Sequence, residues 1–280
     1  MPELPEVETV VRELRPHLTG RSILQVEADW ARTIAEPLED IPRFCALQRG
    51  MRIAGVARRA KFVILELDAP GPPQVAWGAC LIHLRMSGRL VMQPTGRPEH
   101  LRVTWRLTDH KTLYFYNMRK FGRVWLTREP QRVLRELGPE PLSSSFSVAD
   151  LYARLSTRRG MLKPLLLNQQ FIAGLGNIYV DESLFRAGLH PMRKADTLDA
   201  EDVERLYQAI RATLSQAIAQ HGTTFDGLFV RPEGEAGRQQ EGLNVYGQAG
   251  LPCTRCGTPI ERTTVGQRGT HYCPVCQPLP

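Results

Sequence analysis

The chain has 280 residues, 42% of them hydrophobic, which is enough to build two folded domains and a small accessory module. Its formal net charge of +7 favours a polyanionic partner, and nucleic acid is the leading candidate. No apolar run approaches the roughly 18 residues of a membrane span, and the first residues are acidic where a secretory signal would be basic. We therefore expect a cytoplasmic protein with no membrane partner.

The first nine residues, Met1 to Thr9, place a proline directly behind the initiator methionine. Removal of Met1, which a small second residue permits, would leave a free secondary amine on Pro2. An α-amino group has a reference pKa of about 7.7 to 8.0, against about 10.4 for lysine, so near neutral pH far more of it is nucleophilic. Its adduct with an aldehyde carbon is an iminium that has no N–H to lose. Glu3 follows as a possible proton carrier.

Ordinary helix formation explains part of the same stretch. Pro5 suits the first position of a helix, and Glu6 and Glu8 suit the positive end of the helix dipole. Helix formation does not explain Pro2 and Glu3, which precede the helix. A frayed and inert N-terminus is the alternative.

The next hundred residues consist of short β-rich segments separated by Gly and Pro, without helices between them. This pattern favours antiparallel sheets packed as a sandwich or flattened barrel, with the initial helix covering one edge or end. The eight predicted strands are Ile23–Glu27, Met51–Val56, Phe62–Leu67, Val75–Leu84, Arg89–Gln93, Arg102–Leu107, Thr112–Tyr116 and Gly122–Leu126.

Three points in these segments could meet nucleic acid. Lys61 stands at a strand start that could face a cleft, although a solvated turn is the simpler interpretation. Met86 lies beside a Ser-Gly turn, and Arg119 and Phe121 alternate along one side of an extended segment. Buried Met is common core filler, but an exposed apolar side chain on a basic protein can act as a wedge between base pairs.

The composition of the chain changes at residues 137–145, which are rich in Gly, Pro and Ser, and we place a domain boundary there. Beyond it the apolar period becomes helical, and residues 223–242 are polar, irregular and expected to form a mobile loop. The glycine-rich turn before Asn177 could hold a phosphate at a helix start, or it could be a tight turn between packed helices. The predicted helices are Val148–Leu155, Leu162–Gln170, Ile178–Ala187 and Ala200–Gln220.

Four of the six cysteines are clustered near the C-terminal end as two Cys-x2-Cys pairs. Four thiolates at this spacing suit one tetrahedral, structural Zn²⁺, and in a cytosolic protein two disulfides are the poorer alternative. Strands at Ile260–Val265 and Thr270–Tyr272, joined by residues 266–269, would present Arg268 at a hairpin tip for a phosphate contact. The predicted metal ligands are Cys253, Cys256, Cys273 and Cys276.

Taken together, these motifs resemble the formamidopyrimidine-DNA glycosylases, bacterial base-excision repair enzymes that remove oxidised purines. The resemblance runs from Pro2 to Gln277. It rests on Pro-Glu-Leu-Pro-Glu-Val-Glu-Thr at residues 2–9, His-Leu-x-Met-Ser-Gly at 83–88, Arg-x-Phe-Gly at 119–122, Leu-Gly-Pro-Glu-Pro-Leu at 137–142, Gly-Asn-Ile-Tyr at 176–179 and the terminal zinc finger.

The resemblance implies an α+β fold in three parts. An N-terminal catalytic β-sandwich with a leading helix would occupy residues 1–142, a helical domain with a helix-two-turn-helix motif 143–242, and a four-cysteine zinc finger 243–280. The implied partner is damaged double-stranded DNA, bound by a monomer. The implied activity is excision of 8-oxoguanine and formamidopyrimidines, followed by strand cleavage through β,δ-elimination.

The resemblance also assigns roles to individual residues. Pro2 would form a Schiff base with the sugar C1′, and Glu3 would be the acid. Lys61 would donate a proton in β-elimination, and Arg268 would serve the second elimination. The implied DNA-binding residues are His100, Arg119, Arg159, Lys163 and Asn177, and those that fill the gap left by the flipped base are Met86, Arg119 and Phe121.

Four departures from the family pattern bear on lesion preference and DNA affinity. Arg85 stands where the family usually has Gly, and Asn117 where an Asp is common. The family's Gly-Gly-Thr-Thr is shortened to residues 222–224, and Gln248 replaces a usual basic residue.

Two other functions stay open from the sequence. One is an endonuclease VIII-like glycosylase for oxidised pyrimidines, which the pattern at Leu4 and Val7 argues against. The other is a non-catalytic binder of damaged DNA on the same scaffold.

Overall fold

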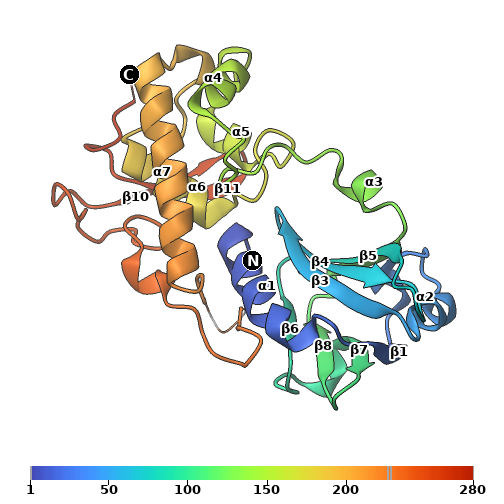
Figure 1. Ribbon diagram of the computed structural model, residues 1–280. Helices are drawn as coiled ribbons and strands as arrows, with labels where there is room; N and C mark the ends of the chain where they lie inside the picture. The colour runs from blue at the N-terminus through green and yellow to red at the C-terminus, as the bar shows by residue number, and fades with distance from the viewer. Residues whose placement is uncertain (1, 226, 228, 280) are drawn as a thin grey trace. The chain divides into compact units, whose positions relative to one another are not determined.

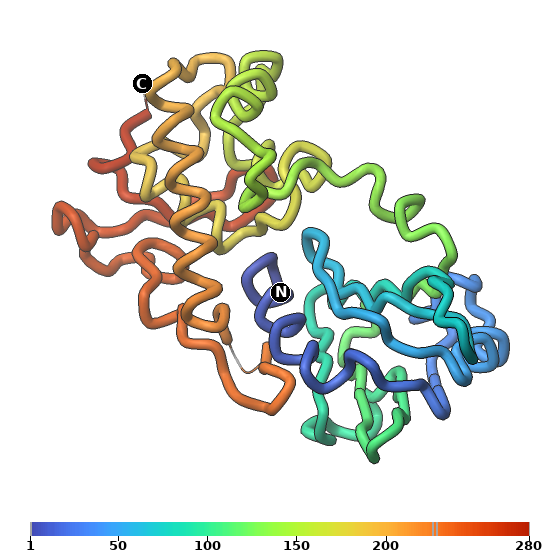
Figure 2. The backbone as a smooth tube through the Cα atoms, viewed as in Figure 1, coloured from blue at the N-terminus to red at the C-terminus, as the bar shows by residue number. Residues whose placement is uncertain are grey.

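The computed structural model describes residues 2–225, 227 and 229–279, and the chain divides into two compact units (Figure 1). The first unit holds the residues up to Arg135 together with Gln220–Arg238, and the second holds Glu136–Ala219 and the residues from Gln239 onward. Figure 2 follows the path of the chain through both units. The segment after the longest helix therefore belongs with the N-terminal part of the chain.

Two sheets build the first unit. One has the strand order β2-β9-β5-β4-β3 and is antiparallel except for the pair β2 and β9, and the other is antiparallel with the order β1-β7-β8-β6. The strands are β1 (Ile23–Ala28), β2 (Ile34–Glu36), β3 (Arg52–Arg59), β4 (Phe62–Asp68), β5 (Ala76–His83), β6 (Gly88–Val91), β7 (Leu101–Leu107), β8 (Thr112–Asn117) and β9 (Arg123–Thr127). All eight predicted strands are present, and none of their ends is shifted by more than three residues.

The inner faces of both sheets and helix α1 (Leu4–Leu18) share one hydrophobic core, as expected for a sandwich with a leading helix. The apolar residues of α1 recur at helical spacing, and the helix packs on β3 and β4. Trp105 is fully buried in this core, and its indole N–H donates to the side-chain oxygen of Gln48 at 2.9 Å. That hydrogen bond removes the desolvation cost of the buried indole nitrogen.

Gln48 ends helix α2 (Ile41–Gln48), which lies between β2 and β3. The expectation of strands with no helices between them is therefore wrong at this point. The Asp40 side chain accepts the Arg43 N–H at 2.9 Å and caps the helix, and Pro42 occupies its first turn. With two turns, the helix is too short for its apolar period to be distinctive.

The second unit is helical and carries a β-hairpin, as predicted. Helices α6 and α7 pack together, and strand β11 lies against α6. The elements are α4 (Val148–Ser156), α5 (Leu162–Leu167), α6 (Asn177–Ala187), α7 (Ala200–Ala219), β10 (Glu261–Val265) and β11 (Arg268–Tyr272); the remaining elements of the chain are α3 (Pro130–Leu134) and the short 3-10 helices η1 (Ala31–Thr33), η2 (Pro98–His100), η3 (Ala195–Thr197) and η4 (Gln239–Gly242).

The hairpin turn is tighter than predicted. Val265 pairs with Arg268, so the turn consists of Gly266 and Gln267 alone, and both have positive φ (56° and 62°). Two central residues with positive φ match a type I′ turn, whose twist fits a two-residue hairpin. Arg268 therefore begins the second strand instead of standing at the tip.

The segment Gln220–Arg238 is irregular, as predicted, but its described residues are fixed to the first unit. Phe229 is part of the hydrophobic core, and the Arg231 guanidinium lies 2.6 Å from the Glu13 carboxylate on α1. The Met92 N–H donates to the Pro232 carbonyl at 2.9 Å. These contacts anchor the loop instead of leaving it loose.

Across the described parts of the chain, no helix combines the length and the apolar content that a bilayer crossing requires.

Candidate active site and nucleic-acid interface

The N-terminus of α1 is buried. Pro2 and Glu3 both lie inside the first unit, while Met1 is outside the described residues. The backbone N–H of Glu3 donates to the Glu6 carboxylate at 2.8 Å, which is the return half of a capping box. The start of the chain is therefore held in place, unlike the frayed terminus that was the alternative.

Glu6 also reaches a part of the chain far away in sequence. Its other carboxylate oxygen accepts the Thr223 N–H at 2.7 Å, and the residue is only 1% exposed. Gly222 packs so closely that a Cβ there would lie 2.8 Å from the same oxygen, and its φ is +78°. Glu6 thus connects the catalytic candidates Pro2 and Glu3 to the loop of Thr223.

Sequence reasoning missed this role, because Glu6 was explained by the helix dipole. A carboxylate three residues after the helix N-cap is the signal that could have indicated the bond to Glu3. His221 (φ +60°) and Gly222 both have the left-handed backbone that a pair of glycines adopts without strain. In the shortened glycine motif, a histidine therefore occupies a left-handed position directly before Gly222.

Lys61 lies in the two-residue turn between β3 and β4 and is 6% exposed. Ala60, directly before it, has a φ of +52° and forms the turn. The neighbouring His83 has its pKa lowered to about 3, first by burial and then by the positive charges of Arg85 and Lys61. His83 is therefore neutral at physiological pH, and its Nδ1 accepts the Arg85 N–H at 3.1 Å.

Arg85 is one of the four departures from the family pattern, and its backbone explains why glycine suits that position. Its φ is +55°, in the left-handed region that side chains with a Cβ rarely adopt. The arginine therefore occupies a conformation that glycine would take at no steric cost.

The predicted gap-filling residues lie on adjoining turns of the first unit. Met86 and Phe121 are 41% and 55% exposed. A nitrogen of the Arg119 guanidinium lies 3.6 Å from the Met86 sulfur, and the Arg119 N–H donates to the Ser87 hydroxyl at 3.1 Å. The structure thus brings Met86 and Arg119 together, with Phe121 two residues further along the same turn.

Asn117, the second departure, holds this turn from inside. Its side chain is fully buried, accepts the Phe121 N–H at 3.0 Å and donates to the Leu84 carbonyl at 3.2 Å. An ionised aspartate could accept the first bond but could not donate the second. The asparagine therefore links the turns that carry Met86 and Phe121.

Two further predicted phosphate contacts, His100 and Arg159, lie in different units. His100 is half-buried and lines a hollow together with Arg89 and Arg97 in the first unit. Arg159 is exposed in the second unit, in the turn between α4 and α5.

Lys163 and Asn177 converge on the strand that begins with Arg268. The Lys163 ammonium lies 2.6 Å from the Asp181 carboxylate and donates to the Gly269 carbonyl at 2.8 Å. The Asn177 amide donates to the same carbonyl at 2.9 Å, and the second Asp181 oxygen accepts the His271 N–H at 2.9 Å. Two helices, α5 and α6, therefore hold β11 directly beside Arg268.

This arrangement differs from the phosphate contact expected for Lys163. Its side chain is fully buried, so its ammonium could reach a phosphate in solvent only by leaving Asp181. Breaking a buried ion pair leaves an uncompensated charge, which is strongly unfavourable. Lys163 supports the hairpin here.

The four clustered cysteines meet as predicted. Their sulfur atoms all lie within 4.8 Å of one another, with Cys253 to Cys276 at 3.8 Å and Cys256 to Cys273 at 3.5 Å. Thiolates about 2.3 Å from a tetrahedral zinc would lie roughly 3.8 Å apart, so the cluster fits this ion. Four sulfur ligands leave no open coordination position, which is the pattern of a structural site.

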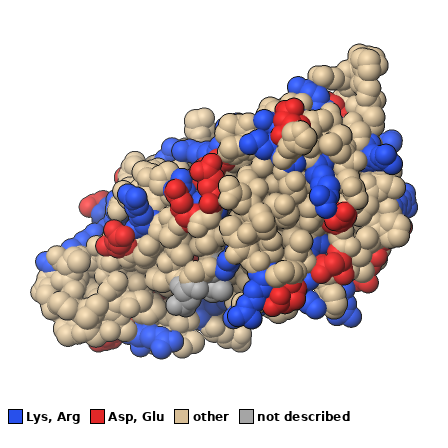
Figure 3. Space-filling view, turned by 90° about the horizontal axis from the view of Figure 1, so that it is seen from below, with Lys and Arg blue, Asp and Glu red and all other residues tan. Residues whose placement is uncertain are grey.

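Charge is mixed on the face of the molecule that Figure 3 shows. On the face shown in Figure 3, Lys and Arg side chains alternate with Asp and Glu, so the basic excess is not gathered in one continuous patch there.

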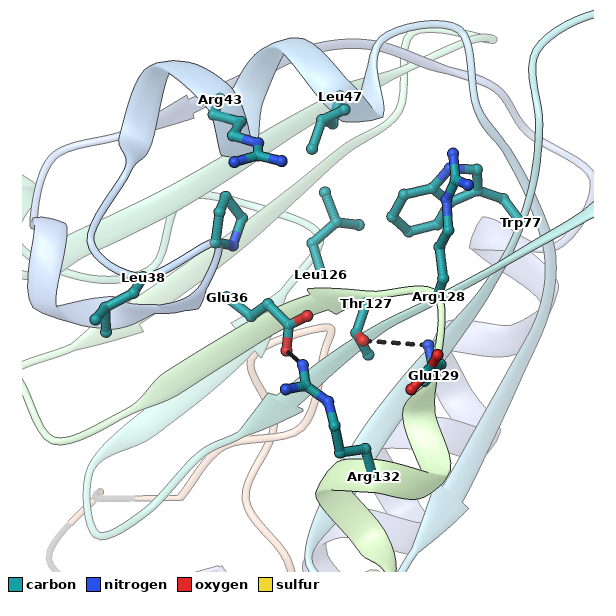
Figure 4. A pocket seen from close by; sticks show the side chains of 11 residues that line it. Glu36, Leu38, Arg43, Leu47, Trp77, Leu126, Thr127, Arg128, Glu129 and Arg132 are labelled. Atoms are coloured by element: carbon teal, nitrogen blue, oxygen red, sulfur yellow. Dashed lines mark hydrogen bonds and ion pairs between the residues drawn. The ribbon is translucent and has the colours of Figure 1, made fainter.

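A separate hollow of about 650 Å³ contains none of the candidate site residues (Figure 4). It is lined by α2, the β2 end and the segment after β9, and the Arg128 guanidinium stacks over the Trp77 ring at 5.6 Å. Arg132 forms an ion pair with Glu36 across it. The charged groups Arg128 and Arg132 are thus engaged with other residues that line the hollow, and we assign it no part in the predicted chemistry.

Three family models cover most of the chain. Residues 1–124 match the formamidopyrimidine-DNA glycosylase N-terminal domain, residues 137–227 match the formamidopyrimidine-DNA glycosylase H2TH domain, and residues 250–279 match a zinc finger found in FPG and IleRS. The boundaries of these matches agree with a sheet domain, a helical region and a zinc-finger hairpin.

Whole-chain relatives agree. Formamidopyrimidine-DNA glycosylase from Geobacillus kaustophilus is 44% identical over 283 residues, covering 99% of this chain and all of that protein, and the Enterococcus faecalis protein of the same name is 42% identical over 285 residues, covering 100% and 98%. The crystal structure of the MutM (Fpg) protein from Thermus thermophilus is 40% identical, with a TM-score of 0.87 and 99% and 98% coverage.

A complex of Lactococcus lactis Fpg with DNA that contains an abasic site is 35% identical, has a TM-score of 0.87, and covers 99% of this chain and 100% of that protein. Matching models for each part and similarity over the full length leave one conclusion. The chain belongs to the formamidopyrimidine-DNA glycosylase family, whose members are base-excision DNA glycosylases with abasic-site lyase activity.

Proposed function

We propose that this enzyme excises oxidised purines through a covalent Pro2 intermediate and then cleaves the strand by β,δ-elimination. The observation that carries the proposal is the buried N-terminus, where Glu6 holds the Glu3 backbone on one side and the Thr223 backbone on the other. A nucleophile gains most from being held in a fixed position, because the loss of orientational freedom is paid during folding. Glu3 adds a buried carboxyl group beside that nucleophile.

The chemistry follows from the secondary amine. The Pro2 nitrogen attacks C1′, the bond from C1′ to the base breaks, and the base leaves with a proton that Glu3 can supply. Opening of the sugar ring gives an iminium between Pro2 and C1′, which acidifies the C2′ hydrogens. A water molecule takes a C2′ proton and the C3′–O bond breaks, so that the 3′ phosphate leaves with Lys61 as the proton donor to its oxygen. Arg268 serves the expulsion of the 5′ phosphate, which follows the loss of a C4′ proton to water in the same way. Hydrolysis of the iminium then frees Pro2.

DNA binding requires the damaged nucleotide to leave the stack, since C1′ is unreachable inside a duplex. Met86, Arg119 and Phe121 are proposed to fill the vacated space, which their exposure on adjoining turns supports. His100, Arg119 and Arg159 are proposed phosphate contacts. Asn177 is proposed as a further contact to the DNA backbone, and Lys163 is proposed to contribute by holding the Arg268 strand.

The proposed substrates are 8-oxoguanine and formamidopyrimidines in duplex DNA. One structural relative from Lactococcus lactis is a complex with Fapy-dG DNA, and another is a complex with DNA that contains an oxidised pyrimidine. Oxidised pyrimidines are therefore the second candidate substrate class. Action as a monomer in the cytoplasm, and the division of the chain at residues 142 and 242, remain proposals.

Borohydride trapping tests the nucleophile. Incubation with an abasic-site duplex and borohydride should crosslink the enzyme, and peptide mass spectrometry should place the sugar on the Pro2 nitrogen. Pro2→Gly should trap far less, and acetylation of the terminal amine should abolish trapping, because both change the attacking nitrogen. A bond to a lysine, or full activity of a blocked terminus, would disprove the mechanism.

A panel of duplexes with 8-oxoguanine, ring-opened purines and oxidised pyrimidines tests the substrate class. We expect base release from both purine lesions to be faster than from the pyrimidines, measured as single-turnover rates. Faster release of the pyrimidines would instead favour the endonuclease VIII-like function.

Cys273→Ser tests the zinc site. The purified protein should contain one zinc per chain, and the variant should lose it, because serine is a poor ligand for this soft, four-thiolate site. DNA affinity should fall while the first unit stays folded by circular dichroism. Cys45→Ser, outside the cluster, is the control that should keep its metal; zinc retained by Cys273→Ser with full affinity would contradict the assignment.

Arg119→Ala tests the DNA contact. Binding should weaken, and the slope of log K against log salt should decrease by about 0.9, the release expected for one phosphate contact. Arg43→Ala, in the hollow of Figure 4, is the matched arginine control and should leave the slope unchanged. Equal slopes for wild type and Arg119→Ala would rule the contact out.

A further inference from the structure

Lys61 lies in the turn of the β3–β4 hairpin. Arg58, close to that turn, binds the hairpin to helix α1. The Arg58 Nε donates to a Glu8 carboxylate oxygen at 2.7 Å, and an Arg58 Nη donates to the Ala60 carbonyl at 3.1 Å. Ala60 is the residue directly before Lys61. One planar guanidinium therefore connects the helix to the backbone that carries the lysine.

Glu8 stands on the helix that begins beside Pro2. It is six residues after Pro2, which in an α-helix is less than two turns. Its second oxygen accepts the Arg12 Nε at 2.7 Å, one helical turn further along. Glu8 is thus bound from both sides and cannot move freely.

The pair is largely shielded from water. The side chains of Arg58 and Glu8 are 11% and 17% exposed. Burial alone raises the pKa of the Glu8 carboxyl, but hydrogen bonds and charges from Arg58 and Arg12 outweigh burial and leave the pKa below its usual range. Glu8 is therefore ionised, and its bond to Arg58 is charge-assisted.

A second ion pair in the same hairpin has a purely structural role and serves as a comparison. Arg52 and Asp68 pair at 3.0 Å at the opposite end, where β3 and β4 already hydrogen-bond to each other. That pair joins two neighbouring strands. The pair of Arg58 and Glu8 instead joins the turn end of the hairpin to a different element, the helix that carries the nucleophile.

We propose that Glu8 and Arg58 are positioning residues that set where the Lys61 ammonium lies relative to the Pro2 nitrogen. The inference rests on the proposed function, in which both groups act on the same sugar. A shift of about 1 Å in a reacting group can slow a reaction by about a hundredfold. The bond from Arg58 to the Ala60 carbonyl acts on the backbone one residue from Lys61, so its loss moves the lysine directly.

Glu8→Gln tests the proposal in the full-length zinc-loaded enzyme. It keeps the shape of the side chain but removes the charge and replaces one of the two acceptor oxygens by a donor, so the side chain can no longer accept from both Arg58 and Arg12. Single-turnover β-elimination at a preformed abasic site should slow by about ten- to a hundredfold, while the DNA dissociation constant stays within roughly twofold. Asp68→Asn is the matched control and should cleave at close to the wild-type rate. Equal rates for Glu8→Gln and wild type overturn the inference.

Lys61→Ala separates this proposal from a general loss of structure. If Glu8 acts through Lys61, Glu8→Gln should cost nothing further in the Lys61→Ala background. A loss of similar size in both backgrounds overturns the inference while leaving the role of Lys61 intact. If Lys61→Ala itself cleaves at the wild-type rate, the proposed function of Lys61 fails, and the inference fails with it.

Arg58→Gln removes the same bond from the other partner and guards against a folding defect in Glu8→Gln. Urea unfolding of each variant identifies such a defect. Arg58→Gln should slow β-elimination at least as much as Glu8→Gln, because it also loses the bond to the Ala60 carbonyl, and a wild-type rate for a folded Arg58→Gln contradicts the proposal.

Discussion

A buried carboxylate that must be satisfied organises the proposed active site. Glu6 is excluded from water, and a polar group there is tolerated only if hydrogen bonds replace its hydration. The backbone N–H groups of Glu3 and Thr223 supply those bonds. Two segments that lie more than 200 residues apart in the chain are thereby joined at the helix start, where Pro2 and Glu3 are buried.

The second unit also contains a buried side chain that is satisfied by hydrogen bonds, and here that side chain is a lysine. The buried Lys163 ammonium is satisfied by Asp181 and by the Gly269 carbonyl, and Asp181 in turn accepts the His271 N–H. Replacing such an ion pair by apolar side chains is often neutral for stability. The pair of Lys163 and Asp181 therefore contributes more to fixing one geometry than to the free energy of folding. The geometry defined here is that of the strand that starts with Arg268. In both units, a buried polar side chain fixes the backbone beside a candidate catalytic group: Glu6 does so beside Pro2, and Lys163 beside Arg268.

Much of the fold follows from local patterns. The strands of the first unit are short apolar runs bounded by turn residues, and helices α4, α6 and α7 have clear apolar periods, so their positions could be predicted. Helix α2 and strand β2 could not, because two helical turns and three strand residues carry too little periodicity. The fixed loop of Phe229 and Arg231 looked mobile, because its anchoring partners lie in distant parts of the chain.

The sequence by itself determined which chemical groups are available: a proline directly behind the initiator methionine and beside a carboxyl, four thiols spaced for one zinc, and Met, Arg and Phe beside turn residues. These properties depend on residue type and short spacing. Only the tertiary structure decided that Glu6 bridges to Thr223, that Arg58 binds Glu8, and that Lys163 is buried against Asp181. The reason is physical, since burial and long-range hydrogen bonds depend on which distant segments pack together, and no local propensity encodes that choice.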